Sequence, residues 1–437
     1  MSAELAARCV FPSFPGSVPP DWARRFLAGG GGGIVFFAYN VDTIDSLAAL
    51  CAALRAERGD ALLAIDEEGG DVTRLEWRTG SSYPGGAALG VIDDTALTEE
   101  VAAAIAADLT AAGVNWNFAP VADVNVPANP VIGTRAFGSD TALVARHVAA
   151  AVRGLQRHGV AACAKHFPGH GSTVEDSHLE LPALVGDLED GLPPFRAAIA
   201  AGVQSIMTAH IRVHDDAATL DRTIISDLLR DELGFEGVVL ADALEMKGVS
   251  SRHDPADAAV LALEAGVDAL IVGHDLGGEV DVFRIVDALA ARVDPERLAE
   301  AAARVDTLAS FAKPRVGAVD RDLIRDAAAR ALRVEGDVSF GRTPTIVELR
   351  SVANSAAGEA EHGIATQIVR EGGEIPDADV YVVRDVHRHP WMVAADRPGA
   401  VIVETGLPVW RPEHARGLIA TFGGGSQSLA AAAELIA

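Results

Sequence analysis

The chain has 437 residues, of which 49% are hydrophobic, 22% charged and 5% aromatic, and its formal net charge is −26. This composition is typical of a globular α/β protein with one large domain and a smaller one, and it excludes a fibrous or disordered chain. The acidic balance argues against a nucleic-acid partner, because phosphate binding requires clustered Lys and Arg side chains.

The start of the chain and the three cysteines bear on location. Met1 to Pro20 contain no long apolar run and no clear cleavage site, so we expect no signal peptide, and no stretch approaches the length of a membrane span. Cys9, Cys51 and Cys163 lie in apolar or Ala-rich runs and are interpreted as buried thiols. We therefore expect a cytoplasmic protein with no membrane partner.

Short apolar runs alternate with Ala- and Leu-rich helical patterns in the first part of the chain. The runs predict strands at Cys9–Phe14, Gly33–Phe37, Ala61–Asp66, Trp116–Pro120, Ala162–Phe167, Ser205–His210, Gly237–Asp242 and Ala269–Gly273. The patterns between them predict helices at Thr43–Arg58, Leu97–Ala112, Asp140–His158, Pro194–Ala201, Ile224–Leu233 and Pro255–Ala265.

Polar residues follow many of these runs, among them Asp66, Asn117, Lys165, His210, Asp242 and His274. A closed barrel concentrates its chemistry at the carboxyl ends of many strands, whereas an open sheet uses one switch point. The sequence therefore favours an α/β fold with a (β/α)8 TIM-type barrel over residues 1–315.

From Ala312 onward the pattern changes, and residues 316–437 predict a linker helix and a small C-terminal α/β domain. The expected helices are Asp320–Val334, Ile346–Ala356 and Leu429–Ile436, and the expected strands are Asp379–Val383 and Ala400–Glu404.

The segment from Ala164 to His178 carries the densest set of reactive side chains. Lys165 and His166 end a buried strand, and glycines then lead into Asp176-Ser177-His178. A carboxylate two residues from an imidazole can orient it and raise its proton affinity, which makes His178 a candidate general acid/base. Two alternatives are that Asp176 and His178 only tie the loop down, or that four histidines (His166, His170, His178 and His210) bind a metal, although no H-E-x-x-H or paired Cys spacing supports a metal.

Two carboxylates also end buried strands. Asp242 closes the run Gly237–Asp242, where a fixed carboxylate can attack an anomeric carbon or can simply cap the next helix. Asp66 can grip sugar hydroxyls through both oxygens. Arg74 and Arg135 lie on the loops that follow, and Arg135 is surrounded by small residues that leave room for a ligand.

Together these segments resemble glycoside hydrolase family 3, in its β-N-acetylglucosaminidase branch. The resemblance runs from about Gly33 to Gly273 and is most specific in KHFPGHGSTVEDSHLELP, at residues 165–182. Supporting motifs are IDEEGG with Arg74, FAPVADVNVPANPVIGTRAFG, MTAHI and GVVLADALEM.

The resemblance implies a retaining β-N-acetylglucosaminidase that needs neither a cofactor nor a metal. Asp242 falls on the family's nucleophile, and Asp176 and His178 fall on the catalytic dyad of the branch, with His178 as acid/base. The positions that bind the hydroxyls of the non-reducing sugar are matched by Asp66, Arg74, Arg135, Lys165 and His166, and His210 matches with a supporting role. The implied partners are small N-acetylglucosaminides, including cell-wall or chitin fragments.

Other activities also fit the sequence. A histidine acid/base does not repel phosphate as a carboxylate does, so a phosphorylase of the same family is an alternative, as is a β-glucosidase. A non-catalytic sugar-binding barrel is a different class, but it would lose Asp242 or His178. The chain departs from the family in Ala241-Asp242-Ala243, where Ser-Asp-Asp is frequent, and in its second domain, whose His387 and His389 are interpreted as structural.

Overall fold

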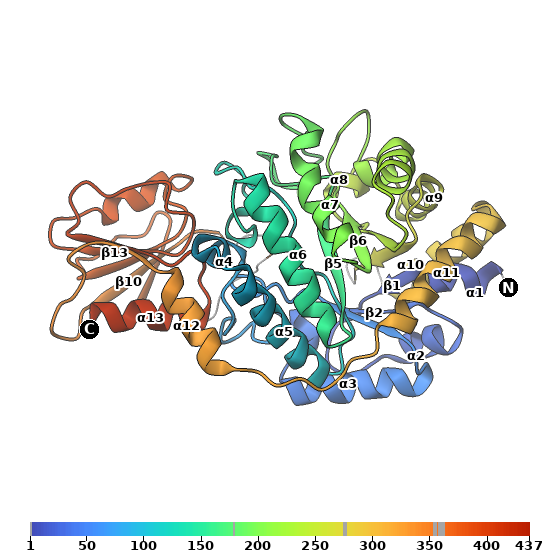
Figure 1. The fold of residues 1–437 in the computed structure, drawn as a ribbon, viewed down its shortest axis with the longest axis horizontal. Helices are drawn as coiled ribbons and strands as arrows, with labels where there is room; N and C mark the ends of the chain where they lie inside the picture. The colour runs from blue at the N-terminus through green and yellow to red at the C-terminus, as the bar shows by residue number, and fades with distance from the viewer. Residues whose placement is uncertain (1, 178–179, 274–277, 353–355, 357–362) are drawn as a thin grey trace.

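The computed structural model describes residues 2–177, 180–273, 278–352, 356 and 363–437. Figure 1 shows a large N-terminal body that carries the chain's first residues at one end and a smaller C-terminal body at the other. None of the helices in the described ranges is long and apolar enough to cross a membrane.

Eight parallel strands form the centre of the larger body. Their hydrogen-bonded order is β1-β8-β7-β6-β5-β4-β3-β2, and β1 also lies against β2, so the sheet curls into a nearly closed barrel. Their bounds are β1 Val10–Pro12, β2 Gly33–Phe36, β3 Leu62–Ile65, β4 Trp116–Asn117, β5 Ala161–Phe167, β6 Ser205–Thr208, β7 Val238–Ala241 and β8 Ala269–Val272. Each apolar run predicted as a strand coincides with one of these strands, although β5 begins one residue before its predicted start, and the predicted barrel is confirmed.

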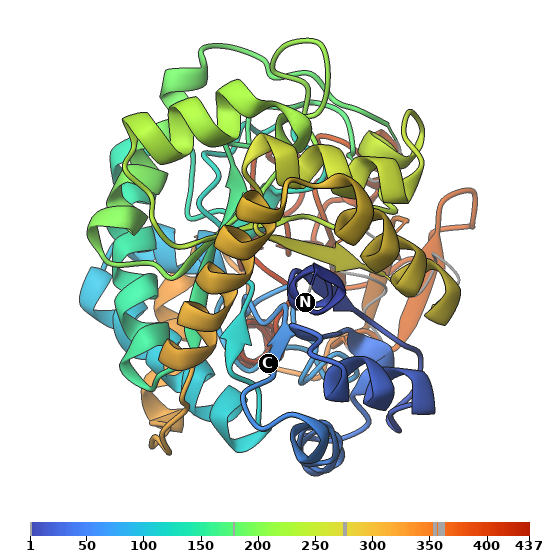
Figure 2. The same cartoon turned by 90° about the vertical axis from the view of Figure 1, so that its right-hand side faces the viewer.

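Helices surround the strands, as the view along the barrel shows (Figure 2). Their bounds are α1 Ser2–Arg8, α2 Asp21–Ala28, α3 Ile44–Glu57, α4 Gly86–Ile92, α5 Thr95–Ala111, α6 Thr141–Arg157, α7 Leu192–Ala200, the π-helix η5 Thr223–Glu232, α8 Lys247–Ser250, α9 Pro255–Ala265, α10 Glu279–Arg292 and α11 Pro295–Phe311. Aspartate side chains start several of them: Asp94, Asp140, Asp254 and Asp294 each accept a backbone N–H of the first helical turn. Such caps satisfy N–H groups that have no partner within the helix.

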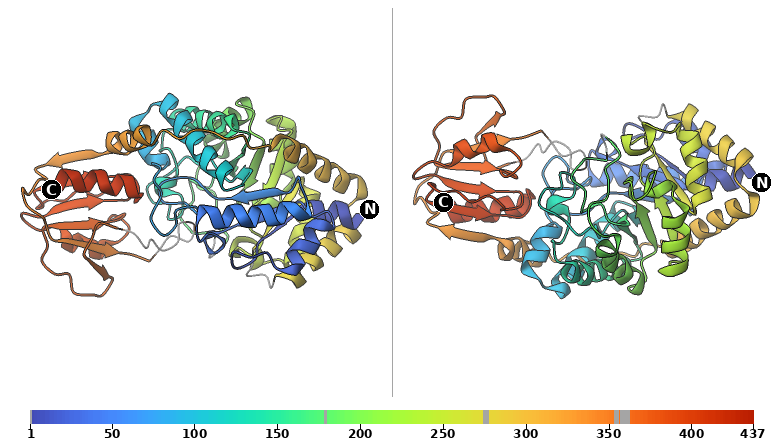
Figure 3. Two further views of the ribbon diagram at one scale, coloured as in Figure 1. Left: turned by 90° about the horizontal axis from the view of Figure 1, so that it is seen from below. Right: turned by 90° about the horizontal axis from the view of Figure 1, so that it is seen from above.

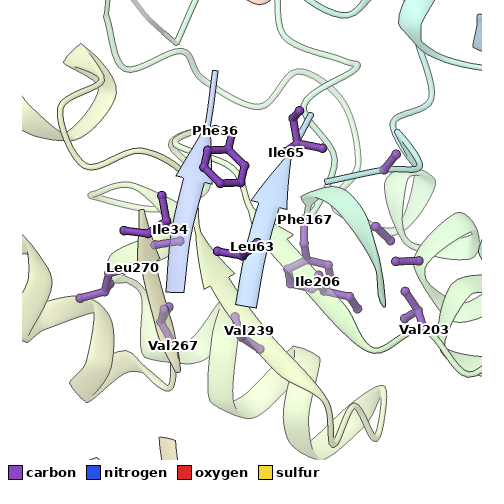
Figure 4. Close-up of a cluster of buried hydrophobic side chains, with 14 of the residues drawn as sticks. Ile34, Phe36, Leu63, Ile65, Phe167, Val203, Ile206, Val239, Val267 and Leu270 are labelled. Carbon is purple, nitrogen blue, oxygen red and sulfur yellow. The ribbon is translucent and has the colours of Figure 1, made fainter. Parts of the chain in front are cut away.

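The strands are apolar throughout because both of their faces are buried. Successive residues of a strand point to opposite faces, so Ile34 and Leu63 pack outward with the helices, as Figure 4 shows, while Val35 and Leu62 fill the barrel interior. Burial of each such side chain contributes about 1.5–3 kcal/mol. Val305 and Leu308 of α11 join the interior cluster and fill one end of the barrel.

The second body contains a six-stranded sheet with the order β11-β10-β12-β13-β14-β9, in which β9 alone runs antiparallel to its neighbour. Its elements are α12 Arg321–Ala331, β9 Arg333–Gly336, β10 Ile346–Arg350, β11 Gln367–Arg370, β12 Val380–Val383, β13 Val401–Glu404, β14 Gly417–Ala420 and α13 Ser426–Ile436. The predicted strands at Asp379–Val383 and Ala400–Glu404 and the predicted helix at Leu429–Ile436 are confirmed.

Two predictions for the second body are wrong. The segment Ile346–Ala356 was expected to be helical, but Ile346–Arg350 forms strand β10, with burial alternating along it. Alternate burial is the period of a strand, and β-branched Ile346 and Val347 favour it. The helix expected at Asp320–Val334 ends at Ala331, because Arg333 and Val334 pair with β14.

The second body lies against one end of the larger one (Figure 3), and polar and apolar contacts join the two. The Arg384 guanidinium binds both carboxylate oxygens of Asp71 at 2.8 Å, and the backbone N–H of Ser426 donates to the carbonyl of Ser81 at 2.8 Å. Phe422 packs in a cluster with Ala87 and Ala88 of α4. These contacts fix the second body against the barrel.

Candidate active site

A cleft of about 1340 Å³ lies between the carboxyl ends of the barrel strands and the second body. From the barrel it is lined by Asp66 after β3, Lys165 and His166 at the end of β5, and Asp242 after β7. The second body contributes the side chains of Glu348, Arg350, Arg384, Asp385, Arg388 and His389. Pockets of roughly 300–1,000 Å³ hold drug-sized ligands, so this cleft has room for more than one sugar ring.

Lys165 joins two carboxylates at the floor of the cleft. Its Nζ lies 2.6 Å from Asp66 Oδ1 and 2.7 Å from Glu68 Oε1, and only 2% of its side chain is exposed. Burial by itself lowers the pKa of the ammonium, but the two carboxylates raise it above its ordinary value. Lys165 is therefore charged, and it holds Asp66 in place.

Glu68 also binds Arg135 through a two-pronged ion pair. Arg135 Nε lies 2.9 Å from Glu68 Oε2, and Arg135 Nη2 lies 2.8 Å from Glu68 Oε1. Although burial raises the pKa of the Glu68 carboxyl, Arg135 and Lys165 lower it well below its ordinary range. Sequence reasoning missed Glu68, which lies beyond the end of β3 at Ile65, where no regular spacing indicates the direction of a side chain.

Arg74 approaches the other side of Asp66. Its Nη2 lies 3.6 Å from Asp66 Oδ2 and also donates to the carbonyl of Ala356 in the second body at 3.1 Å. Asp66, Arg74, Arg135 and Lys165 thus lie together, as their predicted shared role requires.

His166 is oriented by a buried carboxylate that the sequence did not reveal. Its Nδ1 lies 2.7 Å from Asp123 Oδ2, and Asp123 is fully buried. Burial raises the pKa of Asp123, but the His166 ring lowers it below its ordinary value. Asp123 and His166 are 43 residues apart in the chain, so no local pattern could have paired them.

Asp242 follows β7 and is half-buried in the cleft wall, where its Oδ1 accepts the backbone N–H of Ala243 at 2.8 Å. His210 lies behind this segment rather than among the cleft-lining residues. Its Nε2 donates to the carbonyl of Ala243 at 3.0 Å, and its Nδ1 lies 2.9 Å from Thr219 Oγ1. Its contacts therefore support the backbone beside Asp242.

The loop after β5 brings Asp176 and Ser177 to the same cleft. Ser177 is buried, its Oγ lies 2.8 Å from His170 Nε2, and its carbonyl accepts the N–H of Gly248, in α8, at 3.1 Å. Since α8 comes shortly after Asp242, the loop is held beside the Asp242 segment. His178, the predicted acid/base, lies outside the described residues.

The comparison that decides the family is the match to the model described as "Glycosyl hydrolase family 3 N terminal domain", over residues 24–308. The chain belongs to glycoside hydrolase family 3. Its predicted membership is thus confirmed.

Curated relatives of this family 3 chain include bacterial proteins named for hexosaminidase activity. "Beta-hexosaminidase" of Bordetella avium is 38% identical over 255 residues, which cover 55% of this chain and 73% of that protein. "Beta-hexosaminidase A" of Pseudoalteromonas piscicida is 33% identical over 330 residues, and the match spans 67% of this chain but only 55% of the relative's length.

Among solved structures, the family 3 β-N-acetylglucosaminidase of Paenibacillus sp. str. FPU-7 superposes with a TM-score of 0.87 at 28% identity. The match covers 100% of this chain and 97% of that one. The likeness therefore includes the second body as well as the barrel.

The floor of this family 3 cleft can bind neighbouring sugar hydroxyls. Asp66 accepts hydrogen bonds, while Lys165, Arg74 and Arg135 donate them, and their ion pairs fix the geometry before a ligand arrives. Within the described ranges, no three or more His, Cys, Asp or Glu side chains lie close enough together to hold a metal ion.

Proposed function

We propose that this family 3 glycoside hydrolase is a retaining β-N-acetylglucosaminidase that removes terminal β-linked N-acetylglucosamine. The observation that carries the proposal is one cleft in which Asp242 and the Asp176–Ser177 segment lie with the polar cluster of Asp66, Lys165 and Arg135. The names of the relatives point to the same activity.

In the first step of the proposed reaction, Asp242 attacks the anomeric carbon of the terminal sugar. A carbon–oxygen bond to the carboxylate forms while the glycosidic bond breaks, and protonated His178 gives its proton to the departing oxygen. Asp176 supports this transfer, because a carboxylate beside an imidazole raises its proton affinity.

In the second step, water attacks the same carbon and the bond to Asp242 breaks, while His178 accepts the proton of the water. Two displacements restore the starting configuration, so the product is released as the β-anomer. Asp66, Arg74, Arg135, Lys165 and His166 are proposed to hold the sugar hydroxyls through both steps, and His210 to support the backbone beside Asp242.

The natural substrate class is proposed to be small N-acetylglucosaminides, and we further propose a cytoplasmic location. The three cysteines are buried free thiols, which are usual in a reducing compartment. Fractionation of cells, with detection of the protein in each fraction, checks the location.

Covalent trapping tests the nucleophile. A fluorinated N-acetylglucosamine donor with a good leaving group should form a stable glycosyl-enzyme, and mass spectrometry of peptides should place the sugar on Asp242. Asp242→Asn is the matched control and should take up no label. Label on another carboxylate would contradict the assignment.

Product analysis tests the activity. A chromogenic N-acetylglucosaminide should be cleaved with a much higher kcat/KM than the matching glucoside, and NMR should show the β-anomer of N-acetylglucosamine first. The same reaction with added phosphate should give no sugar phosphate. Equal or better cleavage of the glucoside, or formation of a sugar 1-phosphate, would replace the proposal with one of the alternative activities.

A further inference from the structure

The second body touches the barrel beside the loop that carries Asp176. The contact is made by His387 and Arg388, in the turn that follows β12. His387 Nε2 donates to the carbonyl of Pro127 at 2.9 Å, and Arg388 Nη1 donates to the carbonyl of Pro130 at 3.3 Å. Arg388 Nη1 also lies 3.5 Å from the carbonyl of Asn129. The turn thus binds the backbone of one short barrel segment, residues 127–130.

Within that segment, Asn129 fixes the root of the Asp176 loop. Its side chain is 1% exposed, and its Nδ2 donates to the carbonyls of His170 and Thr173, both at 2.9 Å. Its Oδ1 accepts the N–H groups of Val131 and Ile132 at 2.9 and 2.7 Å. One buried amide therefore ties the segment held by the second body to the loop.

The two backbones are also in direct contact next to Asn129. The N–H of Val126 donates to the carbonyl of Gly171 at 3.0 Å. A Cβ added at Gly171 would lie 2.1 Å from the carbonyl oxygen of Val124, so no larger residue fits there. A shift of residues 124–130 would therefore shift the loop as well.

Hydrogen bonds extend from His170 along the loop as far as Ser177, the residue after Asp176. His170 Nδ1 lies 3.0 Å from Thr173 Oγ1. Because the Thr173 hydroxyl donates to the backbone carbonyl of His170, the Nδ1 atom carries the proton in this contact. The other ring nitrogen, Nε2, then accepts a hydrogen bond from Ser177 Oγ. Arg388 and Asp176 both line the cleft. Burial lowers the pKa of the Arg388 guanidinium, and the carboxylates of Asp385 and Asp176 oppose that shift.

We propose that the turn at His387 and Arg388 is a positioning element for the acid/base loop, and that it acts through Asn129. The inference rests on the proposed function, in which Asp176 belongs to the dyad. The barrel carries the nucleophile and the sugar-binding cluster by itself, but the second body sets the geometry of proton donation. His387, which the sequence alone suggests is structural, thus takes part in the proposed positioning element.

Leaving-group dependence separates a positioning effect from a general loss of structure. Proton donation matters for an alkyl or sugar leaving group and hardly matters for dinitrophenol, which departs without a proton. Small displacements of a catalytic group cost up to about 100-fold in rate. Arg388→Ala should therefore lower kcat/KM on the order of 10–100-fold for the poor leaving group and only about 2-fold for the dinitrophenyl glycoside.

Two further variants sharpen the test. Arg388→Lys keeps the charge but not the fork of donors, and it should give a smaller loss with the same selectivity; it also serves if Arg388→Ala does not fold. Asn129→Ala should show the same selectivity, and the double variant with Arg388→Ala should lose less than the product of the single losses, because both act along one path.

Arg330→Ala is the matched control. Arg330 Nη2 binds Asp94 Oδ2 at 3.1 Å, which is another ion pair between the second body and the barrel but lies away from the cleft lining. This variant should leave kcat/KM unchanged for both leaving groups, and circular dichroism and thermal unfolding should show that each protein is folded.

His178→Ala, measured in parallel, separates the inference from the proposed function. If its loss is selective for poor leaving groups and that of folded Arg388→Ala and Arg388→Lys is equal for all, or absent, the positioning role is overturned and the function stands. If His178→Ala itself loses activity equally with every leaving group, the acid/base assignment fails, and the positioning role fails with it.

Discussion

Asp66 directly follows strand β3 and Lys165 lies near the end of strand β5, and the Oδ1 of the first is 2.6 Å from the Nζ of the second. The pair is almost closed off from solvent, since 2% of the lysine side chain and 16% of the aspartate side chain are exposed. Glu68 Oε1 also lies 2.7 Å from Nζ, so the lysine binds two carboxylates. A donor and an acceptor are therefore fixed side by side where the proposed sugar ring binds.

Removal of the Lys165 charge should affect stability and activity together. Lys165→Met removes the cation that Asp66 and Glu68 share, and leaves only Arg135 beside Glu68 and Arg74 beside Asp66. Loss of one partner of an isolated buried ion pair costs about 3–5 kcal/mol, and the free energy of unfolding should fall by less than that, because the two arginines still face the carboxylates. Urea denaturation measures the loss, and kcat/KM on an N-acetylglucosaminide should fall by at least 100-fold.

Lys165→Arg is the control, because it retains the charge. It should recover most of the stability but little of the activity, since the larger guanidinium displaces Asp66. A stable and fully active Lys165→Met variant would show that the cluster is dispensable.

Removal of the proposed proton donor should depend on the leaving group. His178→Ala should lower the rate on the order of 10²–10⁴-fold for ordinary glycosides and far less for a dinitrophenyl glycoside. Asp176→Ala should follow the same pattern more mildly, because the proposed role of this carboxylate is to support the acid/base and not to donate the proton itself. Steady-state kinetics with a series of leaving groups measures how the rate of each variant depends on the leaving group. An equal loss of rate with every leaving group would refute the assignment.

The barrel was predictable from the sequence because its signal is local and repeated. Each strand is a short apolar run that is buried on both faces, and a helical pattern was predicted after six of the eight. The second body was harder to predict. Ile346–Arg350 buries only alternate residues, and a five-residue segment with three apolar and two charged residues fits a strand or the start of a helix equally well.

The candidate site was predictable only in part. Asp66, Lys165 and Asp242 were found because strand ends in a barrel converge. Glu68 and Asp123 were missed, because Glu68 binds Arg135 across 67 residues and Asp123 binds His166 across 43, and neither separation leaves a local pattern. The approach of Arg388 to the loop depends on how two bodies pack, which a sequence pattern does not encode.

The pH dependence of stability should carry the signature of His170. Burial, together with the charge of His166, lowers the pKa of His170 from 6.5 to about 4. Above pH 6.5 the ring is neutral in both the folded and the unfolded chain and has no effect on the slope. Between about pH 6.5 and 4 only the unfolded chain binds the proton, so the free energy of unfolding falls as the pH falls, by up to about 1.4 kcal/mol per pH unit.

The comparison that isolates this effect is between the natural chain and His170→Gln. Urea denaturation at several pH values should give a steeper fall for the natural chain between about pH 6.5 and 4, and equal slopes above that range. Equal slopes throughout would mean that His170 titrates normally in the folded protein.

The ion pair between Asp71 and Arg384 should couple the second body to the barrel. Arg384 Nη1 and Nη2 each lie 2.8 Å from one oxygen of Asp71, and the N–H of Gly424 donates to the same carboxylate at 2.8 Å. Burial raises the pKa of Asp71, but Arg384 lowers it to about 2.

Truncation of one partner in such a pair costs about 2–5 kcal/mol, much of it from the charge left behind. Asp71→Ala and Arg384→Ala should each lower the free energy of unfolding by that amount, while the double variant should lose clearly less than the sum, because no charge is stranded. Limited proteolysis should then cut between the bodies, near residues 312–320, faster in each single variant than in Arg330→Ala, whose exposed ion pair contributes little. Additive losses in the double variant, with unchanged proteolysis, would show that the two bodies are held together by their other contacts.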